Sequence, residues 1–486
     1  MPVPGLWGTP IARRQVMRVG AAAAGVTAVG GLLSACTGGK ASGTAAQPSV
    51  ATPVIELTFM PWWIYWNPTG RSIVQQQADT FAQTHPGLRL TALPGPQGGG
   101  ASTSGVISSI IAGTGPDVVG DCCGSWVTYT SQGVFADLNT YFKKDNVDVG
   151  TWAKAQAAAL SSPAGQLGLP IYNGPVVYAC RQDILDNLGL QYPDPQWSYK
   201  DAAALWAQCA GTYQVSGKPH TRVGANFWWQ SHSWYAQAFL FYGFGGAEMD
   251  ATGTKARFDD PGSLEAAQWV YPLLWNKVLG AGTGTIADGS AAFEPAGGWS
   301  IPRNVTGWGN KFKWQYYPLP KFPKGRTTFN NNDFWGMNAQ SKHLEGAWQV
   351  MKWLTFEDDW QRFCMKTTLL APCKVALWAE FEQQLIATAP ILANKGLNWF
   401  RDAAEGGYGY PEEFFKYQAT QADTLIGKVM GDIYDRKIDV PGGFAKVTQQ
   451  VNALEVAGAA DTVAATVAQA LFPTTGAPIA AVQPGL

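Results

Sequence analysis

Four large aromatic rings within five positions are the first feature of this sequence that could recognise a ligand. They lie in the segment PWWIYWNPTG at residues 61–70, and they are Trp62, Trp63, Tyr65 and Trp66. Rings of this size are costly to expose to water without a partner. Their flat faces suit the apolar CH faces of sugar rings, although the same rings could instead pack beneath the fold. We treat Trp62, Trp63 and Trp66 as binding candidates and expect two of the four rings to face a ligand.

A carboxylate lies near the end of another predicted strand. Asp121 follows the strand predicted at 117–119 by two residues. Ligands of open α/β sheets bind at the carboxyl ends of the strands, where a carboxylate can accept charge-assisted hydrogen bonds from two sugar hydroxyls. Asp121 could equally be an ordinary helix cap.

The sequence lacks the common signatures of catalysis. It contains no G-x-S-x-G, H-E-x-x-H or G-x-x-x-x-G-K-[ST] motif, and its four histidines are scattered, with no two cysteines at zinc-knuckle spacing. The two carboxylates of a glycosidase can lie far apart in sequence, so that reading stays open. We predict a binding protein rather than an enzyme, with no cofactor and no metal.

The charge balance excludes one class of partner. The 486 residues include 34 Lys and Arg against 35 Asp and Glu, so no basic excess is available to neutralise a nucleic acid backbone. Near the candidate loops we find only Arg71 and Arg303, which argues against phosphate or sulfate as the main ligand group. A polyamine held by Asp121 and Asp333 between aromatic walls remains an alternative.

The N-terminus has the order of an export signal. Arg13, Arg14 and Arg18 precede an uncharged run of small and apolar residues at 19–35. The text ARRQVMR resembles the twin-arginine export motif, and LSAC resembles the bacterial lipobox, whose cysteine here is Cys36. We therefore predict an export signal at 1–36, a Gly-, Ser- and Pro-rich tether at 37–53, and lipid anchoring through Cys36 to the outer face of the cytoplasmic membrane.

The mature chain would keep six cysteines, and an exported protein can oxidise them. They are Cys122, Cys123, Cys180, Cys209, Cys364 and Cys373. Sequence alone cannot fix their pairing. Cys364 with Cys373 closes a short loop and is the pair we favour.

Strands and helices alternate through the first part of the mature chain. Ile55–Met60 is predicted as a strand, 73–84 as a helix, 88–93 as a strand, and a short helix ends at Ile111 before the strand at 117–119. This rhythm is typical of a parallel α/β sheet. Further helices are predicted at 201–213, 262–279, 344–356, 360–368 and 418–431, and further strands at 176–180 and 312–317.

Seven short motifs then occur in one order. They are GTGPDVV (113–119), GLPIYNGPVVYACRQDILDNLGL (168–190), PDPQWSYKDAAAL (193–205), GSAAFEPAGGWSIP (289–302), YYPLPKFP (316–323), FWGMNAQSKHLEGAWQVMKWLT (334–355) and LLAPCKVAL (369–377). In this order they resemble family 1 of the extracellular solute-binding proteins of ABC importers, the group that includes maltose and other sugar binders. One departure is at Tyr178 to Arg181, where the tyrosine of the family pattern is present but its Asn and Lys are not.

The resemblance implies a two-lobed periplasmic-binding-protein-like fold of type II, α/β in class, with the ligand cleft between the lobes. The first lobe would comprise 54–171 plus 318–355, and the second 172–317 plus 356–486. It implies a monomeric receptor that delivers a mono- or oligosaccharide to the transmembrane subunits of an ABC permease. A polyamine or glycerophosphodiester receptor of the same fold is an alternative, and a cell-surface glycan-active enzyme a further one.

The remaining candidate residues follow from the positions that match the family. Tyr172 and Asn173 occupy the predicted crossover between lobes, and Trp299 falls on the G-x-W turn. The others lie near predicted strand or helix ends, and they are Trp228, Trp229, Asp333, Trp335 and Tyr410. Five further tryptophans at helical spacing are expected in the core: Trp206, Trp269, Trp275, Trp348 and Trp353.

Overall fold

The computed structural model describes residues 53–61, 70–94, 101–122, 125–152, 160–162, 165–227, 234–330, 333–405, 409–411, 415 and 417–471. These belong to one unit, residues 52–486. The predicted export signal, including Cys36, and all but the last residue of the predicted tether lie outside the described residues. Within the described part of the chain, no helix is both long and apolar enough to cross a membrane.

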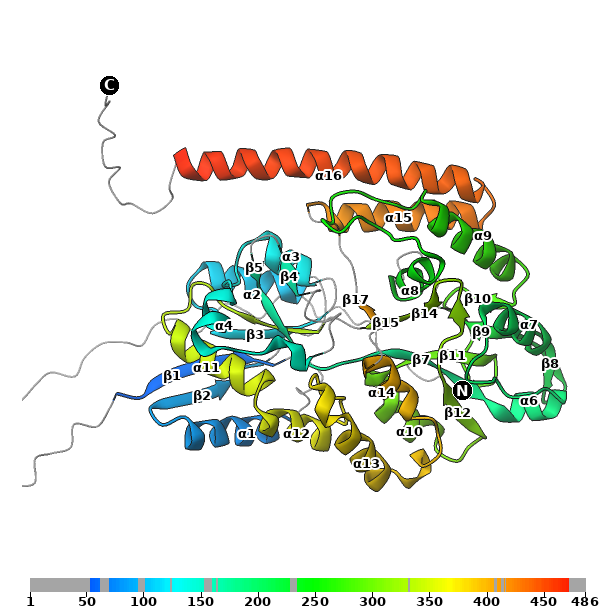
Figure 1. The fold of residues 1–486 in the computed structure, drawn as a ribbon, viewed down its shortest axis with the longest axis horizontal. Helices are drawn as coiled ribbons and strands as arrows, with labels where there is room; N and C mark the ends of the chain where they lie inside the picture. The colour runs from blue at the N-terminus through cyan, green and yellow to red at the C-terminus, as the bar shows by residue number, and fades with distance from the viewer. Residues whose placement is uncertain are drawn as a thin grey trace, which may run out of the picture. The chain divides into compact units, whose positions relative to one another are not determined.

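The first sheet has five strands in the order β2 (Leu88–Ala92), β1 (Ile55–Met60), β3 (Val118–Asp121), β16 (Phe334–Met337) and β6 (Gly168–Pro170). The first three are parallel, and β16 is antiparallel to both its neighbours. Parallel strands need a crossover, which α1 (Gly70–Thr84) and α2 (Ala101–Ile111) supply here. The predicted strand and helix order of this region is confirmed (Figure 1).

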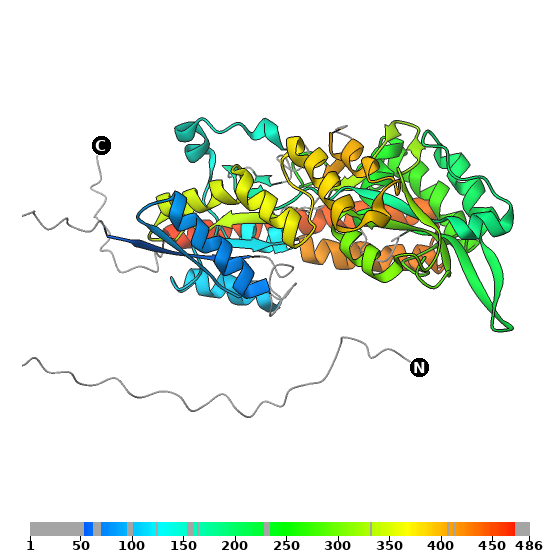
Figure 2. The same cartoon turned by 90° about the horizontal axis from the view of Figure 1, so that it is seen from below.

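The second sheet has six strands. Its order is β10 (Leu279–Gly280), β9 (Lys218–Asn226), β11 (Ala291–Gly297), β7 (Val176–Arg181) and β12 (Trp314–Tyr317), and β8 (Gly211–Val215) pairs with β9. The β8–β9 hairpin is antiparallel and extends beyond the other strands in Figure 2. The helix predicted at 201–213 ends earlier, at Cys209, and strand β8 of this hairpin begins at Gly211.

Helices cover both sheets. On the first sheet side these are α3 (Ser125–Ser131), α4 (Asn139–Asp145), α11 (Leu344–Thr355) and α12 (Asp358–Thr367). The others are α6 (Gln182–Leu188), α7 (Tyr199–Cys209), α8 (Trp234–Phe244), α9 (Pro261–Trp275), α10 (Ile301–Trp308), α13 (Trp378–Thr388), α14 (Asn398–Glu405), α15 (Ala419–Tyr434) and α16 (Val440–Leu471). Short 3-10 turns lie at Val149–Thr151, Gly298–Ser300, Val375–Leu377 and Pro390–Leu392.

Three two-stranded sheets complete the fold. They are β4 (Ser161–Ser162) with β5 (Gly165–Gln166), β13 (Lys321–Phe322) with β14 (Gly325–Arg326), and β15 (Thr328–Asn330) with β17 (Gly409–Pro411). The last pair is parallel and joins segments about eighty residues apart in sequence.

Buried tryptophans hold the cores together. Trp206, Trp348 and Trp353 are fully buried, as predicted, whereas Trp269 and Trp275 are only partly buried against the core of the second sheet. In the core of the first sheet, which we call the first core, Trp353 lies edge-on to Phe59, with ring centroids 6.4 Å apart. Such aromatic pairs contribute about 1 kcal/mol beyond the area they bury.

Packing divides the chain differently from the predicted lobe boundaries at 318 and 355. Phe322 and Phe329 belong to the core of the second sheet, although 318–355 was assigned to the first lobe. Trp360 and Cys364 belong to the core of the first sheet, although 356–486 was assigned to the second. The chain returns to the first sheet only at β16. Helix α12 then packs on the first sheet, because its apolar face contacts the core cluster that contains Phe59.

The favoured disulfide is wrong. No disulfide joins Cys364 to Cys373 in the structure. The Cys373 Sγ faces the Thr355 carbonyl oxygen at 3.8 Å. Burial raises the pKa of Cys373 to about 12, so this thiol stays protonated and is unreactive.

Candidate functional site

The chain passes directly from the first sheet to the second through residues 171–175, which join β6 to β7. The backbone N–H of Ile171 donates to the carbonyl of Asp333 at 3.0 Å. Across the strands, Phe334 is in register with Asp121 on one side and Pro170 on the other. The ends of β3 and β6 and the start of β16 therefore meet at this crossover, and they bring both predicted carboxylates to it.

The crossover itself carries two buried predicted residues. Tyr172 is buried against the first core and Asn173 is fully buried. Neither the amide nitrogen nor the amide oxygen of Asn173 has a hydrogen-bond partner among the described residues. An unpaired buried amide costs about 1–3 kcal/mol, so this position is unfavourable for the fold unless a further group binds there.

Trp299 meets the crossover from the second sheet. It lies in the 3-10 turn that follows β11, is half-buried, and packs against the cores of both sheets. A Cβ built on Gly297 would lie 2.2 Å from its ring, and one built on Gly174 would lie 3.1 Å from it. Glycine is therefore needed at 297, where the indole lies directly over the backbone.

A buried polar network fixes the turn that carries Trp299. The Ser300 hydroxyl donates to the Gly297 carbonyl at 2.7 Å. The Asn304 Nδ2 donates to the Ser300 Oγ and to the Tyr316 hydroxyl, each at 3.1 Å. Burial raises the pKa of Tyr316, so this hydroxyl stays protonated. These hydrogen bonds connect the turn that carries Trp299 to α10 and to β12, which is a strand of the second sheet.

Asp121 is a fully buried carboxyl group at the end of β3. Its Oδ1 accepts from the Cys122 N–H at 2.8 Å, and its Oδ2 from the Thr103 hydroxyl at 3.3 Å. Burial raises the pKa of Asp121 to about 6, against the lowering effect of the Cys122 hydrogen bond. The group is thus mostly ionised at neutral pH but close to its titration range.

Sequence reasoning missed one residue of the crossover. The buried Thr328 hydroxyl accepts from the Val176 N–H at 3.2 Å and donates to the Val176 carbonyl at 2.5 Å, which fastens β15 to the start of β7. No sequence signal marks this threonine, because the contact joins positions that are 152 residues apart.

Trp335 belongs to the first core rather than to an accessible ligand surface. It is fully buried beside Phe59 and Trp360, and its ring lies over the backbone of Gly120. Successive side chains of β16 point to opposite faces of the sheet, and the side chain of Trp335 points into the core layer. Burial alone does not decide its ligand contact, since Asn173 and Asp121 are equally buried, and that contact stays a prediction.

Several predicted residues cannot be placed. Trp62, Trp63, Trp66, Trp228 and Trp229 lie outside the described residues. The backbone of Tyr410 lies in β17 in register with Phe329, and its side chain is outside the description. Among the described residues, no group of three or more His, Cys, Asp or Glu side chains could hold a metal ion.

Comparisons with known proteins agree on the architecture. The family described as bacterial extracellular solute-binding protein matches residues 65–359. No curated protein sequence matches the chain.

Solved structures share the fold at low sequence identity. The cyclic alpha-maltosyl-1,6-maltose binding protein of Arthrobacter globiformis has a TM-score of 0.67 at 16% identity, covering 83% of this chain and 99% of its own. An ABC substrate-binding protein of Listeria monocytogenes, in complex with cycloalternan, has a TM-score of 0.64 at 16% identity, with coverages of 82% and 98%. A sugar transporter of Rhizobium etli in an open conformation has a TM-score of 0.66 at 16% identity, with coverages of 82% and 100%. The predicted two-lobed α/β fold is confirmed.

Proposed function

The chain belongs to the family of bacterial extracellular solute-binding proteins, and from this premise we propose that it captures a mono- or oligosaccharide between its two lobes and delivers it to an ABC permease. The lobes are the layers built on the two sheets. The family is one of binding proteins, and we infer that the ligand leaves chemically unchanged.

The crossover supports this proposal more than any other observation. A half-buried indole, Trp299, reaches the cores of both sheets beside a buried amide, Asn173, that has no partner among the described residues. An aromatic face with a few fixed polar groups is the composition that suits a sugar ring, which is apolar on its faces and polar at its edges. Asp121 and Asp333 would accept hydrogen bonds from sugar hydroxyls.

The likeness to sugar-binding structures supports the same ligand class. The proteins compared above are described with maltosyl-maltose, cycloalternan and sugar transport. We extend that class to this chain as a proposal, with Trp62, Trp63, Trp66, Trp228, Trp229 and Tyr410 as further candidates from sequence.

Binding would act by a shift of population between open and closed arrangements of the lobes. A ligand stabilises the closed arrangement only to the extent that it binds that arrangement more tightly. A contact that touches both sheets supplies such differential affinity, and Trp299 has that position. The closed form would then dock on the permease.

Two buried carboxylates at one edge favour a second candidate, a polyamine. Asp121 and Asp333 are both buried near the crossover, and a dication could pair with them. A sugar ligand would leave affinity almost independent of salt, whereas a polyamine would bind less tightly as ionic strength rises.

A thermal-shift panel on the purified full-length chain tests the proposal. Saccharides, polyols, polyamines and glycerophosphodiesters are compared, because a ligand that binds only the native state raises the melting temperature with concentration. We expect one saccharide class to give a concentration-dependent shift. A shift with polyamines alone would overturn the sugar assignment, and product release from an oligosaccharide would overturn the binding role.

The site assignment is tested by Trp299→Ala, with Trp399→Ala as its control. Both tryptophans are half-buried, but Trp399 lies within α14 and packs against a core cluster that contains neither Tyr172 nor Trp299. We expect Trp299→Ala to weaken saccharide binding by about 100-fold, the size of a strong hot-spot loss. Equal affinities of the two variants would remove Trp299 from the site.

We also propose that the protein is exported and anchored by a lipid on Cys36. The support is the arginine, apolar and LSAC order of residues 13–36 together with an extracellular family. Cys36→Ser should release the protein from the membrane fraction of cells. Continued membrane retention of that variant would contradict the anchor.

A further inference from the structure

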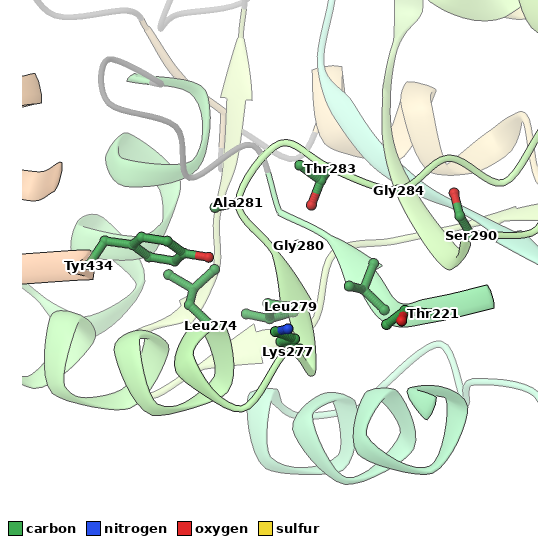
Figure 3. A pocket seen from close by; sticks show the side chains of 11 residues that line it. Thr221, Leu274, Lys277, Leu279, Gly280, Ala281, Thr283, Gly284, Ser290 and Tyr434 are labelled. Atoms are coloured by element: carbon green, nitrogen blue, oxygen red, sulfur yellow. The ribbon is translucent and has the colours of Figure 1, made fainter. Parts of the chain in front are cut away.

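A separate cavity lies at the edge of the second sheet, away from the crossover. It has a volume of about 300 Å³ and lies between the end of α9, strands β9 and β10, the loop before β11, and the end of α15 (Figure 3). Its polar lining comes from Thr221, Lys277, Thr283, Ser290 and Tyr434. A cavity of this size can hold a small molecule of about monosaccharide dimensions.

Most of the polar side chains in this cavity have no partner among the described residues, and Thr221, Lys277 and Thr283 are exposed to solvent. The Lys277 ammonium group and the hydroxyls of Thr221, Thr283 and Tyr434 make no hydrogen bond or ion pair with any described residue. Figure 3 shows the side chains of Tyr434, Thr283 and Lys277 around the backbone of Gly280. Ser290 differs, because its hydroxyl donates to Asp288 at 2.5 Å.

The charge of the lining has one sign. Lys277 is the single ionisable side chain other than Tyr434 among the lining residues, and no carboxylate lines the cavity. The nearby Asp435 is already paired with Lys437 at 2.8 Å. An anion entering the cavity would therefore meet a cation and hydroxyl donors, while Asp288, the carboxylate that adjoins the lining, already accepts from the Ser290 hydroxyl.

The C-terminal ends of α9 and α15 adjoin the cavity, and two of their carbonyls are hydrogen-bonded inside the protein. Carbonyl groups at the ends of α9 and α15 would repel an anion if they were unpaired. The Leu274 carbonyl accepts from the Lys277 N–H at 3.0 Å, and the Tyr434 carbonyl accepts from the Trp275 Nε1 at 2.9 Å. Both carbonyls are thus already used inside the protein.

Lys277 is also held in an unusual backbone conformation. Its φ is 56°, in the left-handed region that residues other than Gly, Asn and Asp seldom adopt. Glycine or asparagine would close the end of α9 at lower cost.

We propose that this cavity binds the carboxylate or phosphate group of a small anion, with Lys277 as its charge partner and the hydroxyls of Thr283 and Tyr434 as donors. The site is separate from the crossover and does not depend on the proposed sugar. Its ligand class differs from that of the crossover, where carboxylates collect instead of a cation.

The test is calorimetric titration of the full-length chain with inorganic phosphate and with D-glucuronate, at low ionic strength, beside neutral D-glucose. We expect saturable binding of at least one anion with a Kd of about 1 mM or lower and no comparable binding of glucose. Whichever anion binds identifies the group as phosphate or carboxylate. No saturation by either anion up to about 20 mM, or equal binding of glucose, would overturn the proposal.

Matched variants assign the binding to this cavity. Lys277→Asn removes the charge and suits the left-handed backbone, and it should weaken anion binding by about 10-fold or more. Lys428→Gln, an exposed lysine on α15 outside the lining, should leave it unchanged. Unaltered anion affinity in Lys277→Asn, with a wild-type melting temperature, would overturn the assignment. Competition between the anion and a saccharide bound at the crossover would overturn it as well.

Discussion

The crossover and the cavity at β9 and β10 are opposite kinds of surface in one fold. The crossover is buried and aromatic, and it holds two carboxylates together with an amide that lacks a partner among the described residues. The cavity is open to solvent and lined by hydroxyls around one lysine. Burial makes each polar group of the crossover expensive for the fold, whereas water can satisfy the groups of the cavity.

This difference predicts how each region responds to substitution. Changes at the crossover should alter stability and binding together, because the same contacts join the two sheets and form the proposed site. Changes at the cavity should alter binding alone.

Gly297→Ala should have the largest effect. The added Cβ would lie 2.2 Å from the Trp299 ring, so either the indole or strand β11 must move. We expect the free energy of unfolding to fall by about 3 kcal/mol, measured by urea denaturation, together with loss of saccharide binding.

The control is Gly307→Ala in α10, where a new Cβ meets nothing within 4 Å. Alanine is the better helix former, so this variant should gain up to about 1 kcal/mol. If Gly297→Ala behaved like Gly307→Ala, the close contact between Trp299 and the β11 backbone would be refuted.

Asp121→Asn should change how stability depends on pH. Because burial raises the folded pKa of Asp121 to about 6 from 3.8, the folded state holds this proton more tightly than the unfolded state. The wild type should therefore lose up to about 3 kcal/mol from this group as the pH rises from about 4 to about 6, with little further change above.

The asparagine variant lacks this titration. Its unfolding free energy relative to the wild type should rise between pH 4 and pH 7, whatever constant offset the lost Thr103 hydrogen bond causes. Urea titrations at several pH values measure the difference. A constant difference across that range would show that Asp121 titrates normally.

Asn304→Ala should have an intermediate effect, because it removes two buried hydrogen bonds of 3.1 Å beneath the Trp299 turn. We expect a loss of about 2 kcal/mol in the free energy of unfolding and weaker saccharide binding. Asn310→Ala, at an exposed position, should stay within about 0.5 kcal/mol of the wild type. A loss of stability with unchanged binding would show that the network supports the fold but not the position of Trp299.

Tyr434→Phe should have the smallest effect on stability. Its hydroxyl has no partner among the described residues and its side chain is 42% exposed, so the melting temperature should hardly change. Anion affinity should still fall by about 10-fold in calorimetry, the value of one hydrogen bond to a charged group. A large drop in stability would erase the contrast between the two regions.

Local patterns predicted most elements because neighbours in sequence determine them. β1 has its predicted bounds at Ile55–Met60, and α11 ends within one residue of its predicted end. α16, from Val440 to Leu471, was not predicted. It begins with Pro and two Gly residues, which favour a turn locally, and its packing against α15 and α9 compensates for their poor helix propensity.

The site was predicted only as a set of residue types. Order along the chain pointed to Tyr172, Asn173, Trp299 and both carboxylates, and the structure gathers them around one crossover. The order of residues along the chain could not distinguish Trp335 from Trp299, since both follow glycine-rich or polar loops. Whether each ring is fully buried or half-buried depends on which side of the strand end its side chain lies.

The sequence by itself determined the family, the α/β alternation and the aromatic and acidic composition of the proposed site, because these depend on residue identity and short spacing. Tertiary structure alone decided that no disulfide joins Cys364 to Cys373, and it decided the burial of Trp335, the raised pKa of Asp121 and the cavity beside Lys277. Each of these depends on distances between segments far apart in the chain. Solvent exclusion and close contact arise only when such segments pack together.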